Sequence, residues 1–326
     1  MKVLFVVSGN SKNFKIAPFI KSQADSIISQ NIAVYYFSIR GKGLLGYLKN
    51  ILPLRKQIKN QNYDIIHSHY ALTGWLSVLT FVKKPIVVSY MGCDTYGDFD
   101  ARGKQTILGY FLILLGKTLQ PFVKSIIVKS DNLAKYIYLK KKLNIIPNGV
   151  DLDKFTPMNK NETRIRLKLD RSIKYILFLG NLSDSRKNFE LLVQSKQHCY
   201  YAFEILSPYP LEHDRITQYM NAADVLVVTS LQEGSPNVIK EAMACNLPVV
   251  STNVGDVKLL FGSEPGHFLT SFDPNDVAEK IKSALEFSEK YGRTNGRKII
   301  LELGLDSQTV AKKIISVYKE VLNISA

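Results

Sequence analysis

Cysteine is scarce in this chain. Its 326 residues include only three cysteines, Cys93, Cys199 and Cys245, and none of them belongs to a CxxC pair or a Cys/His cluster. This spacing argues against a disulfide framework and gives no zinc-site pattern. The cysteine usage favours a reducing compartment, so we expect a cytoplasmic protein.

Long hydrophobic runs are also missing. Only five apolar residues follow one another near the start, at 3–7, which indicates a buried first strand rather than a signal peptide. The most apolar segment elsewhere, 107–116, is far shorter than the roughly 20 residues that span a bilayer. We therefore expect no membrane-spanning helix.

Glutamate is absent from the first 155 residues. This half holds 22 Lys and Arg against 8 Asp, a formal charge of +14, so the rest of the chain contributes only +1 to the total of +15. Such asymmetry favours an anionic partner, although a merely soluble basic surface would also explain it. The charge alone leaves a membrane leaflet, a lipid phosphate and a nucleic acid open as partners. With the resemblance described below, we expect an anionic membrane surface and no nucleic acid.

One segment of this basic half is amphipathic. Residues 42–61 combine leucines and Ile51 with five Lys and Arg, a pattern typical of helices that lie in an anionic membrane interface. Alternatively, the segment is a surface helix that packs its apolar stripe on a sheet, with Pro53 kinking or ending it.

Near-continuous apolar runs alternate with helix-length segments, and the apolar fraction is 46%. This alternation predicts an α/β protein with parallel sheets buried on both faces. The pattern restarts after residue 157, so we expect two Rossmann-like, doubly wound domains with ligands in a cleft between them. The predicted strands are 3–7, 33–38, 64–69, 86–90, 125–130, 175–180, 201–206, 224–230 and 248–253. The predicted domains are 1–155 and 156–305, followed by a C-terminal helix at 306–326.

A strand, a loop and a helix start are indicated within 224–245. Ser235 suits the N-cap and Pro236 the first helical position, so the helix would run from there to about Cys245. Its exposed N–H groups and dipole would form a phosphate site, with Glu233 and Glu241 on either side of the bound anion. The alternative is an ordinary surface helix with two acids. In either case its buried face would comprise Ile239, Ala242 and Met243.

Two further loops follow predicted strands. Arg186 and Lys187 precede a helix near Asn188, where cations would neutralise a diphosphate leaving group, although a solvated Arg-Lys pair is the simpler explanation. Gly9 lies in a short loop after the first strand without a GxGxxG or Walker pattern, so no nicotinamide site is indicated.

Metal-binding patterns are weak. The pairs Asp98/Asp100 and Asp151/Asp153 do not directly follow a buried strand, and His67 and His69 lack a third ligand nearby. We expect no metal, and we interpret the two histidines as cleft-lining or core residues.

Six segments together resemble the GT-B glycosyltransferases, specifically family 4 of the retaining, nucleotide-sugar-dependent enzymes, also called group 1. They span most of the chain, and the last combines the family's Glu, seven residues, Glu signature with EAMA-x-x-x-PVV. The segments are SGN (8–10), YDIIHSHYALTG (63–74), IVVSYMGCDTYGD (86–98), IIPNGVDLDKFTP (145–157), FLGNLSDSRKN (178–188) and NAADVLVVTSLQEGSPNVIKEAMACNLPVVSTNVGD (221–256).

The resemblance implies a role for each matching residue. Glu233 would contact donor-sugar hydroxyls and support charge near the anomeric centre, Glu241 would bind the ribose, and Lys187 with Arg186 would neutralise the departing diphosphate. It also implies a metal-independent reaction with no cofactor beyond the donor. By the same resemblance, domain 1–155 would hold the acceptor, domain 156–305 would bind the nucleotide sugar, and helix 306–326 would pack back on the first domain. The remaining donor-binding residues would be Gly9, Asn181, Gly234, Ser235, Pro236, Asn237 and Val238, and the acceptor or cleft residues His69, Met91, Gly92 and Asp94.

The chain departs from the family pattern at three places. Met91 stands where the family often has histidine, Asn181 replaces an arginine usual after Gly180, and residues 207–220 replace a longer passage that helps to hold the base. The base, UDP or GDP, therefore stays open.

These features together favour a retaining hexosyltransferase. It would use a nucleotide sugar and a polyprenyl-diphosphate-linked or glycan acceptor, in surface-glycan synthesis at the inner face of the membrane. The alternatives are a GT-B-fold nucleotide-sugar epimerase and an inactive partner subunit that binds donor or membrane.

Overall fold

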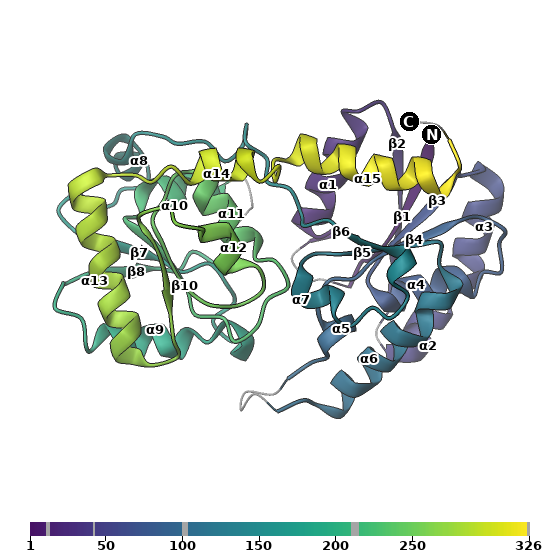
Figure 1. Cartoon of the computed structure of the whole chain (residues 1–326), viewed down its shortest axis with the longest axis horizontal. Helices are drawn as coiled ribbons and strands as arrows, with labels where there is room; N and C mark the ends of the chain where they lie inside the picture. The colour runs from purple at the N-terminus through teal and green to yellow at the C-terminus, as the bar shows by residue number, and fades with distance from the viewer. Residues whose placement is uncertain (11–13, 42, 100–103, 210–214, 325–326) are drawn as a thin grey trace. The chain divides into compact units, whose positions relative to one another are not determined.

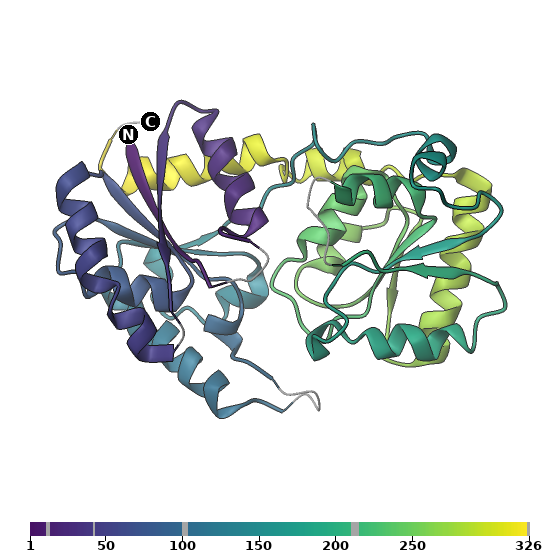
Figure 2. The same cartoon turned by 180° about the vertical axis from the view of Figure 1, so that it is seen from behind.

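The computed structural model describes residues 1–10, 14–41, 43–99, 104–209 and 215–324. The chain divides into two compact units, shown in Figures 1 and 2. Unit 1 comprises Met1–Gly149 and Ser307–Ala326, and unit 2 comprises Val150–Asp306. The first division lies six residues before the predicted one at 155, because Val150 and Phe155 are buried in the core of unit 2.

Unit 1 is built on a six-stranded parallel sheet with the order β2-β1-β3-β4-β5-β6. Its strands are β1 (Lys2–Ser8), β2 (Ala33–Ile39), β3 (Ile65–His69), β4 (Ile86–Ser89), β5 (Ser125–Val128) and β6 (Leu143–Ile145). Its helices are α1 (Pro18–Ile28), α2 (Gly43–Leu48), α3 (Ile51–Gln61), α4 (Ala71–Val78), α5 (Cys93–Tyr96), α6 (Ile107–Leu119), α7 (Asp131–Ala134) and α15 (Ser307–Val321), with 3-10 turns η1 (Gln120–Phe122) and η2 (Lys140–Lys142).

The two faces of this sheet are covered by different helices. Leu4 and Val6 of β1 pack into one core with residues of α3, α4 and α6, while Val3, Phe5 and Val7 pack into another with α1 and α15. Helix α15, yellow in Figures 1 and 2, lies beside α1 and buries Val310, Ile314 and Val317, as its helical spacing predicts.

Unit 2 is built on a five-stranded parallel sheet with the order β11-β10-β9-β7-β8. Its strands are β7 (Tyr175–Leu177), β8 (Glu204–Leu206), β9 (Val225–Val228), β10 (Val249–Thr252) and β11 (His267–Thr270). Its helices are α8 (Lys160–Arg166), α9 (Phe189–Lys196), α10 (Ile216–Ala222), α11 (Asn237–Ala244), α12 (Val257–Phe261), α13 (Pro274–Tyr291) and α14 (Gly296–Glu302), with the 3-10 turn η3 (Ser185–Lys187).

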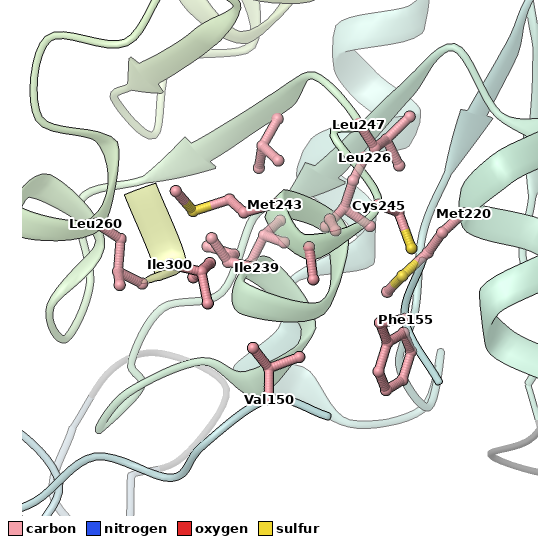
Figure 3. Close-up of a cluster of buried hydrophobic side chains, with 14 of the residues drawn as sticks. Val150, Phe155, Met220, Leu226, Ile239, Met243, Cys245, Leu247, Leu260 and Ile300 are labelled. Atoms are coloured by element: carbon pink, nitrogen blue, oxygen red, sulfur yellow. The ribbon is translucent and has the colours of Figure 1, made fainter. Parts of the chain in front are cut away.

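The core of unit 2 fixes helix α11 against the sheet. Figure 3 shows Ile239 and Met243 of α11 among Leu226, Leu247 and other apolar side chains. Ile239, Met243 and Ala242 are fully buried, so the predicted buried face of this helix is confirmed. The start of α11 is thereby held in place.

A buried ion pair joins α8 to the sheet of unit 2. Arg164 Nη2 lies 2.7 Å from Asp224 Oδ2, and both side chains are almost fully buried. Asp224 also pairs with Lys160 at 2.9 Å and accepts a hydrogen bond from the backbone N–H of Tyr175 at 2.7 Å. Burial raises the pKa of Asp224, but these partners offset that effect and hold the pKa below its usual value.

All nine predicted strands are present, and the fold of two Rossmann-like units is confirmed. The prediction omitted β6 and β11, because these three- and four-residue strands include the polar Asn144 and His267 and lack a continuous apolar run.

The basic segment 42–61 forms two helices, α2 and α3, instead of one. Pro53 does not end α3, because it lies in the first turn, where proline is tolerated. Leu54 and Ile58 of α3 are buried in the core, as the surface-helix alternative requires. Within the ranges given above, no helix is long and apolar enough to cross a membrane.

Candidate functional site

The loop between β9 and α11 leads to a helix start whose amides are not capped by a side chain. Helix α11 begins at Asn237, and Pro236 precedes it as the cap residue with no side-chain cap hydrogen bond. The predicted N-cap at Ser235 and first helical position at Pro236 are each wrong by one residue, because Pro236 is the cap. The Ser235 hydroxyl instead donates to Asp256 Oδ2 at 2.7 Å. The uncapped N–H groups and the helix dipole therefore remain suited to an anion.

Glu233 and Lys187 lie together beside this helix start. Lys187 Nζ lies 2.5 Å from Glu233 Oε1, and Ser230 Oγ donates to the same oxygen at 2.9 Å. Both ionised side chains remain partly exposed, at 28% for Lys187 and 20% for Glu233. The structure thus brings together the two residues with the strongest predicted catalytic roles.

Two hydrogen bonds hold their loops together. Thr229 Oγ1 donates to the carbonyl oxygen of Lys187 at 3.0 Å, and the backbone N–H of Leu231 donates to that of Arg186 at 2.8 Å. A Cβ at Gly180 would lie 3.2 Å from Lys187 Cγ, so the glycine leaves room for the lysine stem. The position of Lys187 is therefore set by backbone contacts on both sides.

Arg186 points to a different partner. Its guanidinium forms an ion pair with Asp184, with Nη2 2.8 Å from Oδ2, on the exposed η3 turn. Burial raises the pKa of Asp184, yet the hydrogen bonds and charge of Arg186 hold it below its usual value. Asn181 is exposed and accepts a hydrogen bond from the N–H of Ser183 at 3.1 Å. Both residues take part in local turn contacts.

Lys240 was not identified as a site residue from the sequence. Its side chain is fully buried, and Nζ donates to Ser235 Oγ at 3.1 Å. Burial lowers the pKa of Lys240 to about 8, while the charges of Asp256 and Glu241 act in the opposite direction. One sequence feature could have indicated its burial: Lys240 follows directly after Ile239, which lies on the predicted buried face of this helix. A Lys240–Ser235–Asp256 network therefore lies behind the helix start.

Gly255 brings a second loop against the Glu233 loop. Its φ of +59° is left-handed, and a Cβ there would lie only 2.7 Å from the carbonyl oxygen of Gly234 and 3.1 Å from that of Glu233. Only glycine allows this approach without displacing backbone. The loop after β10 therefore packs directly against the backbone of the Glu233 loop.

The remaining donor residues lie on the same segment or in unit 1. Gly234 is buried, whereas Val238 and Glu241 are partly exposed on α11. Gly9, in unit 1, donates its N–H to the carbonyl oxygen of Ile39 at 2.9 Å, and a Cβ there would lie 3.0 Å from Ser38 Cβ.

Asp94 braces the loop that carries Met91 and Gly92 in unit 1. Its Oδ1 accepts the N–H groups of Met91 at 2.9 Å and Gly92 at 3.0 Å, and Oδ2 accepts that of Ala71 at 3.0 Å. Burial raises the pKa of Asp94 to about 6, against the opposing effect of these bonds. Asp94 thus positions the backbone of this loop, and Met91 remains partly exposed.

His67 and His69 are buried residues of β3. Their rings stack with centroids 4.3 Å apart, and His67 contacts Tyr318 Oη at 2.6 Å and Ser89 Oγ at 2.8 Å. Burial, together with the charge of Lys129, lowers the pKa of both histidines well below its usual value, so both are neutral. The structure favours the core interpretation over the cleft-lining one.

The paired aspartates give no common arrangement. Asp151 Oδ1 accepts the N–H groups of Asp153 at 3.0 Å and Lys154 at 3.1 Å, which is a local turn contact. Asp100, the partner of Asp98, lies outside the described residues, as do residues 210–214 of the shortened 207–220 passage.

Two family models match this sequence. The model described as Glycosyltransferase Family 4 matches residues 12–154, and the one described as Glycosyl transferases group 1 matches residues 203–286. Together these matches cover most of the chain.

Curated relatives and solved structures agree with this match. The chain is 23% identical to the UDP-Gal:alpha-D-GlcNAc-diphosphoundecaprenol alpha-1,3-galactosyltransferase of Escherichia coli, over 77% of this chain and 73% of the relative. It is also 23% identical to the N,N'-diacetylbacillosaminyl-diphospho-undecaprenol alpha-1,3-N-acetylgalactosaminyltransferase of Campylobacter jejuni, over 89% and 86%. Among solved structures, sucrose-phosphate synthase from Thermosynechococcus elongatus aligns over all of both chains with a TM-score of 0.82 and 17% identity.

Proposed function

The chain belongs to the GT-B glycosyltransferases of family 4, group 1, and we propose that it transfers a hexose from a nucleotide-diphosphate sugar to a lipid-linked or polysaccharide acceptor. The proposal rests on the ion pair between Lys187 Nζ and Glu233 Oε1, 2.5 Å apart, beside the start of α11, which has no side-chain cap. A cation beside a helix start without a side-chain cap suits a diphosphate, and a neighbouring carboxylate suits sugar hydroxyls.

In the proposed reaction, the bond between the anomeric carbon and the diphosphate breaks while an acceptor hydroxyl attacks the same face. The departing phosphate oxygen takes the acceptor's proton, so no side chain serves as the general base. Negative charge grows on the diphosphate, where Lys187 and the amides of α11 stabilise it. Glu233, released from Lys187 by the incoming phosphates, accepts hydrogen bonds from the sugar and supports positive charge at the anomeric centre.

This chemistry retains the anomeric configuration and needs no metal, because Lys187 and the helix start supply the positive charge. Glu241 of α11 is partly exposed and would hold the ribose on the other side of the anion. The base and the sugar are left open between UDP- and GDP-linked hexoses.

The acceptor is proposed from the relatives. Both curated relatives carry names in which the acceptor is linked to undecaprenol through a diphosphate. The basic charge of residues 1–155 suits such an anionic lipid and the membrane surface around it. We place the reaction at the inner face of the cell membrane, in cell-surface glycan synthesis.

A donor screen tests the proposal. Purified chain is titrated calorimetrically with UDP- and GDP-hexoses, and hydrolysis and transfer to an undecaprenyl-diphosphate sugar are followed with and without EDTA. We expect one donor to bind and react equally well with EDTA, and NMR of the product to show a retained anomeric configuration.

Matched variants assign the roles. Lys187→Ala and Glu233→Gln should each lower kcat by about 100-fold or more, whereas Arg186→Ala should retain most activity because Arg186 pairs with Asp184. Donor isomerisation without transfer would indicate an epimerase. Donor binding without hydrolysis or transfer, or no binding of any donor, would indicate an inactive partner. Any of these results would refute the transferase proposal.

A further inference from the structure

Helix α6 of unit 1 presents large apolar side chains to solvent. We define the α6 apolar face as the exposed residues Ile107, Leu108, Tyr110, Phe111 and Leu114. Ile107 is 90% exposed, Tyr110 62% and Leu114 57%. A helix that is apolar on all sides is normally buried, and a contiguous exposed apolar face marks an interaction site. The α6 apolar face therefore needs a partner.

The opposite side of α6 is already fixed to unit 1. Gly109, Leu112, Gly116 and Leu119 are buried, and a Cβ at Gly109 would lie 2.5 Å from the backbone of Asp98. The carbonyl oxygen of Gly116 accepts a hydrogen bond from Tyr90 Oη at 2.6 Å. These contacts fix the inner side of α6 to unit 1.

The surroundings of this face are basic. Residues 101–130 contain five Lys and Arg and no Asp or Glu. Lys104 lies just before α6, Lys117 in its last turn and Lys124 shortly after it, and all three are exposed. Aromatic and aliphatic side chains flanked by lysines are the composition of helices that bind anionic bilayers. The charge therefore favours a lipid surface over a second copy of this basic unit.

We propose that the α6 apolar face inserts into the interfacial layer of an anionic membrane leaflet. The 13 residues of α6 measure about 20 Å at 1.5 Å per residue, too short to cross the hydrocarbon core, so the helix lies in the plane of the membrane. The proposal adds a specific membrane contact to the proposed function. It is tested without donor or acceptor, so its failure leaves the transferase proposal standing.

This contact differs from the one that the sequence suggested for 42–61. Leu54 and Ile58 of α3 are in the core, so that segment keeps only part of its apolar stripe for a bilayer. Leu45 and Leu52 are highly exposed, at 82% and 75%. A double variant of these two residues separates the segment's contribution from that of α6.

Vesicle sedimentation gives the first test. The full chain should co-sediment with vesicles of phosphatidylglycerol and phosphatidylcholine, bind pure phosphatidylcholine at least about tenfold more weakly, and dissociate as salt is raised. The variant Ile107→Ser/Tyr110→Ser/Leu114→Ser should lower the partition coefficient by about tenfold or more, since each apolar side chain contributes to insertion. It should keep the wild-type circular dichroism spectrum, because the inner contacts of α6 are untouched.

A matched control uses exposed apolar residues of unit 2. Tyr200, Leu259 and Leu301 are 97%, 62% and 53% exposed. Their triple serine variant should bind anionic vesicles within about twofold of wild type, because their unit carries almost no net charge. Equal losses of vesicle binding in both triple variants would indicate non-specific hydrophobic binding and overturn the proposal.

The single tryptophan of the chain provides a direct signal from α6. Trp75 Nε1 donates to the carbonyl oxygen of Leu115 at 2.9 Å, and its ring lies 5.3 Å from that of Phe122, which is 58% exposed. Anionic vesicles should shift Trp75 emission to shorter wavelength in wild type and in Leu45→Ser/Leu52→Ser, but not in the α6 triple variant.

Three other results would also overturn the proposal. Wild type could show no emission shift and no sedimentation with anionic vesicles, or the α6 triple variant could bind as well as wild type. Finally, the wild-type protein could be a dimer in solution while the α6 triple variant is a monomer, which would assign the face to contact between copies of the chain.

Discussion

Gly255 supports the loop that carries Glu233, and replacing it with alanine tests that support. A Cβ at this position would lie 2.7 Å from the carbonyl oxygen of Gly234, whereas ordinary contact begins at 3.4 Å. Both atoms belong to the backbone or are fixed to it, so no flexible side chain can move aside. Gly255→Ala must therefore displace the Glu233 loop by about 0.7 Å, the difference between these two distances.

Two effects contribute to the expected result. First, alanine at a φ of +59° destabilises the folded state by roughly 1 kcal/mol relative to glycine. Second, the displaced loop moves Glu233 away from its catalytic position. Gly262 provides a control, because its φ is +51° and nothing lies within 4 Å of a Cβ built there. Gly262→Ala therefore has the conformational cost alone.

We expect both variants to lower the melting temperature by a few degrees, about 2–4 °C per kcal/mol for a unit of this size. Activity should separate them. A displacement approaching 1 Å at a catalytic group lowers the rate by about 10- to 100-fold, so Gly255→Ala should lose this much kcat/KM while Gly262→Ala stays within about twofold.

The assay is transfer from the donor identified in the screen, with calorimetric melting of both variants. Equal kcat/KM for the two variants would refute the argument that Gly255 sets the position of Glu233. A Gly255→Ala protein that melts as wild type and reacts normally would show that the two loops are not in contact in solution.

Three further predictions concern buried charges and hydrogen bonds. Asp224→Asn should lower the free energy of unfolding by about 3–5 kcal/mol at neutral pH, because it leaves Arg164 buried and unpaired. The folded pKa of Asp224 is held below its usual value, so its stabilisation is present above about pH 4 and is lost as pH falls through the folded pKa. The free energy of unfolding should therefore fall less steeply with acid pH in the variant than in wild type. Tyr318→Phe should cost about 1–3 kcal/mol in denaturant unfolding of unit 1, because His67 loses its 2.6 Å hydrogen bond, and an unchanged midpoint would contradict that. Because the pKa of Lys240 is about 8, donor affinity should fall between about pH 7 and about pH 9 as the lysine loses its charge, and Lys240→Arg should remove that fall in calorimetry.

The parts of the fold that were predictable from the sequence are periodic. Nine apolar runs gave nine strands, and the spacing of Ile239 and Met243 gave the buried face of α11, because these patterns depend on neighbours along the chain. The strands β6 and β11 were not predicted, because each includes a polar residue, Asn144 or His267, and lacks a continuous apolar run.

The contacts within the site were less accessible. Lys187 and Glu233 are 46 positions apart, and only the family resemblance suggested that they act together. The Ser235 hydroxyl has two competing uses, a helix cap or a bond to Asp256 twenty-one positions away, and local rules favour the cap. The burial of Lys240 was not predicted, because its neighbours include Ser235 before the helix and Asp256 sixteen positions further along the chain.

The α6 apolar face shows a further limit. From composition, 107–116 is an apolar segment too short to span a membrane, and its glycines at 109 and 116 do not indicate which side of a helix faces the protein. Only the tertiary contacts show that these glycines hold the inner side and that the large residues face outward.

The placement of α15 in unit 1 affects the order in which the chain can fold during synthesis. Unit 2 is one uninterrupted segment, whereas unit 1 needs a helix that the ribosome makes after all of unit 2. Until then the side of the first sheet that later receives Val310, Ile314 and Tyr318 is left open. The second unit can therefore complete its core before the first, and a nascent chain halted after residue 306 would carry an uncovered apolar surface for chaperones to bind.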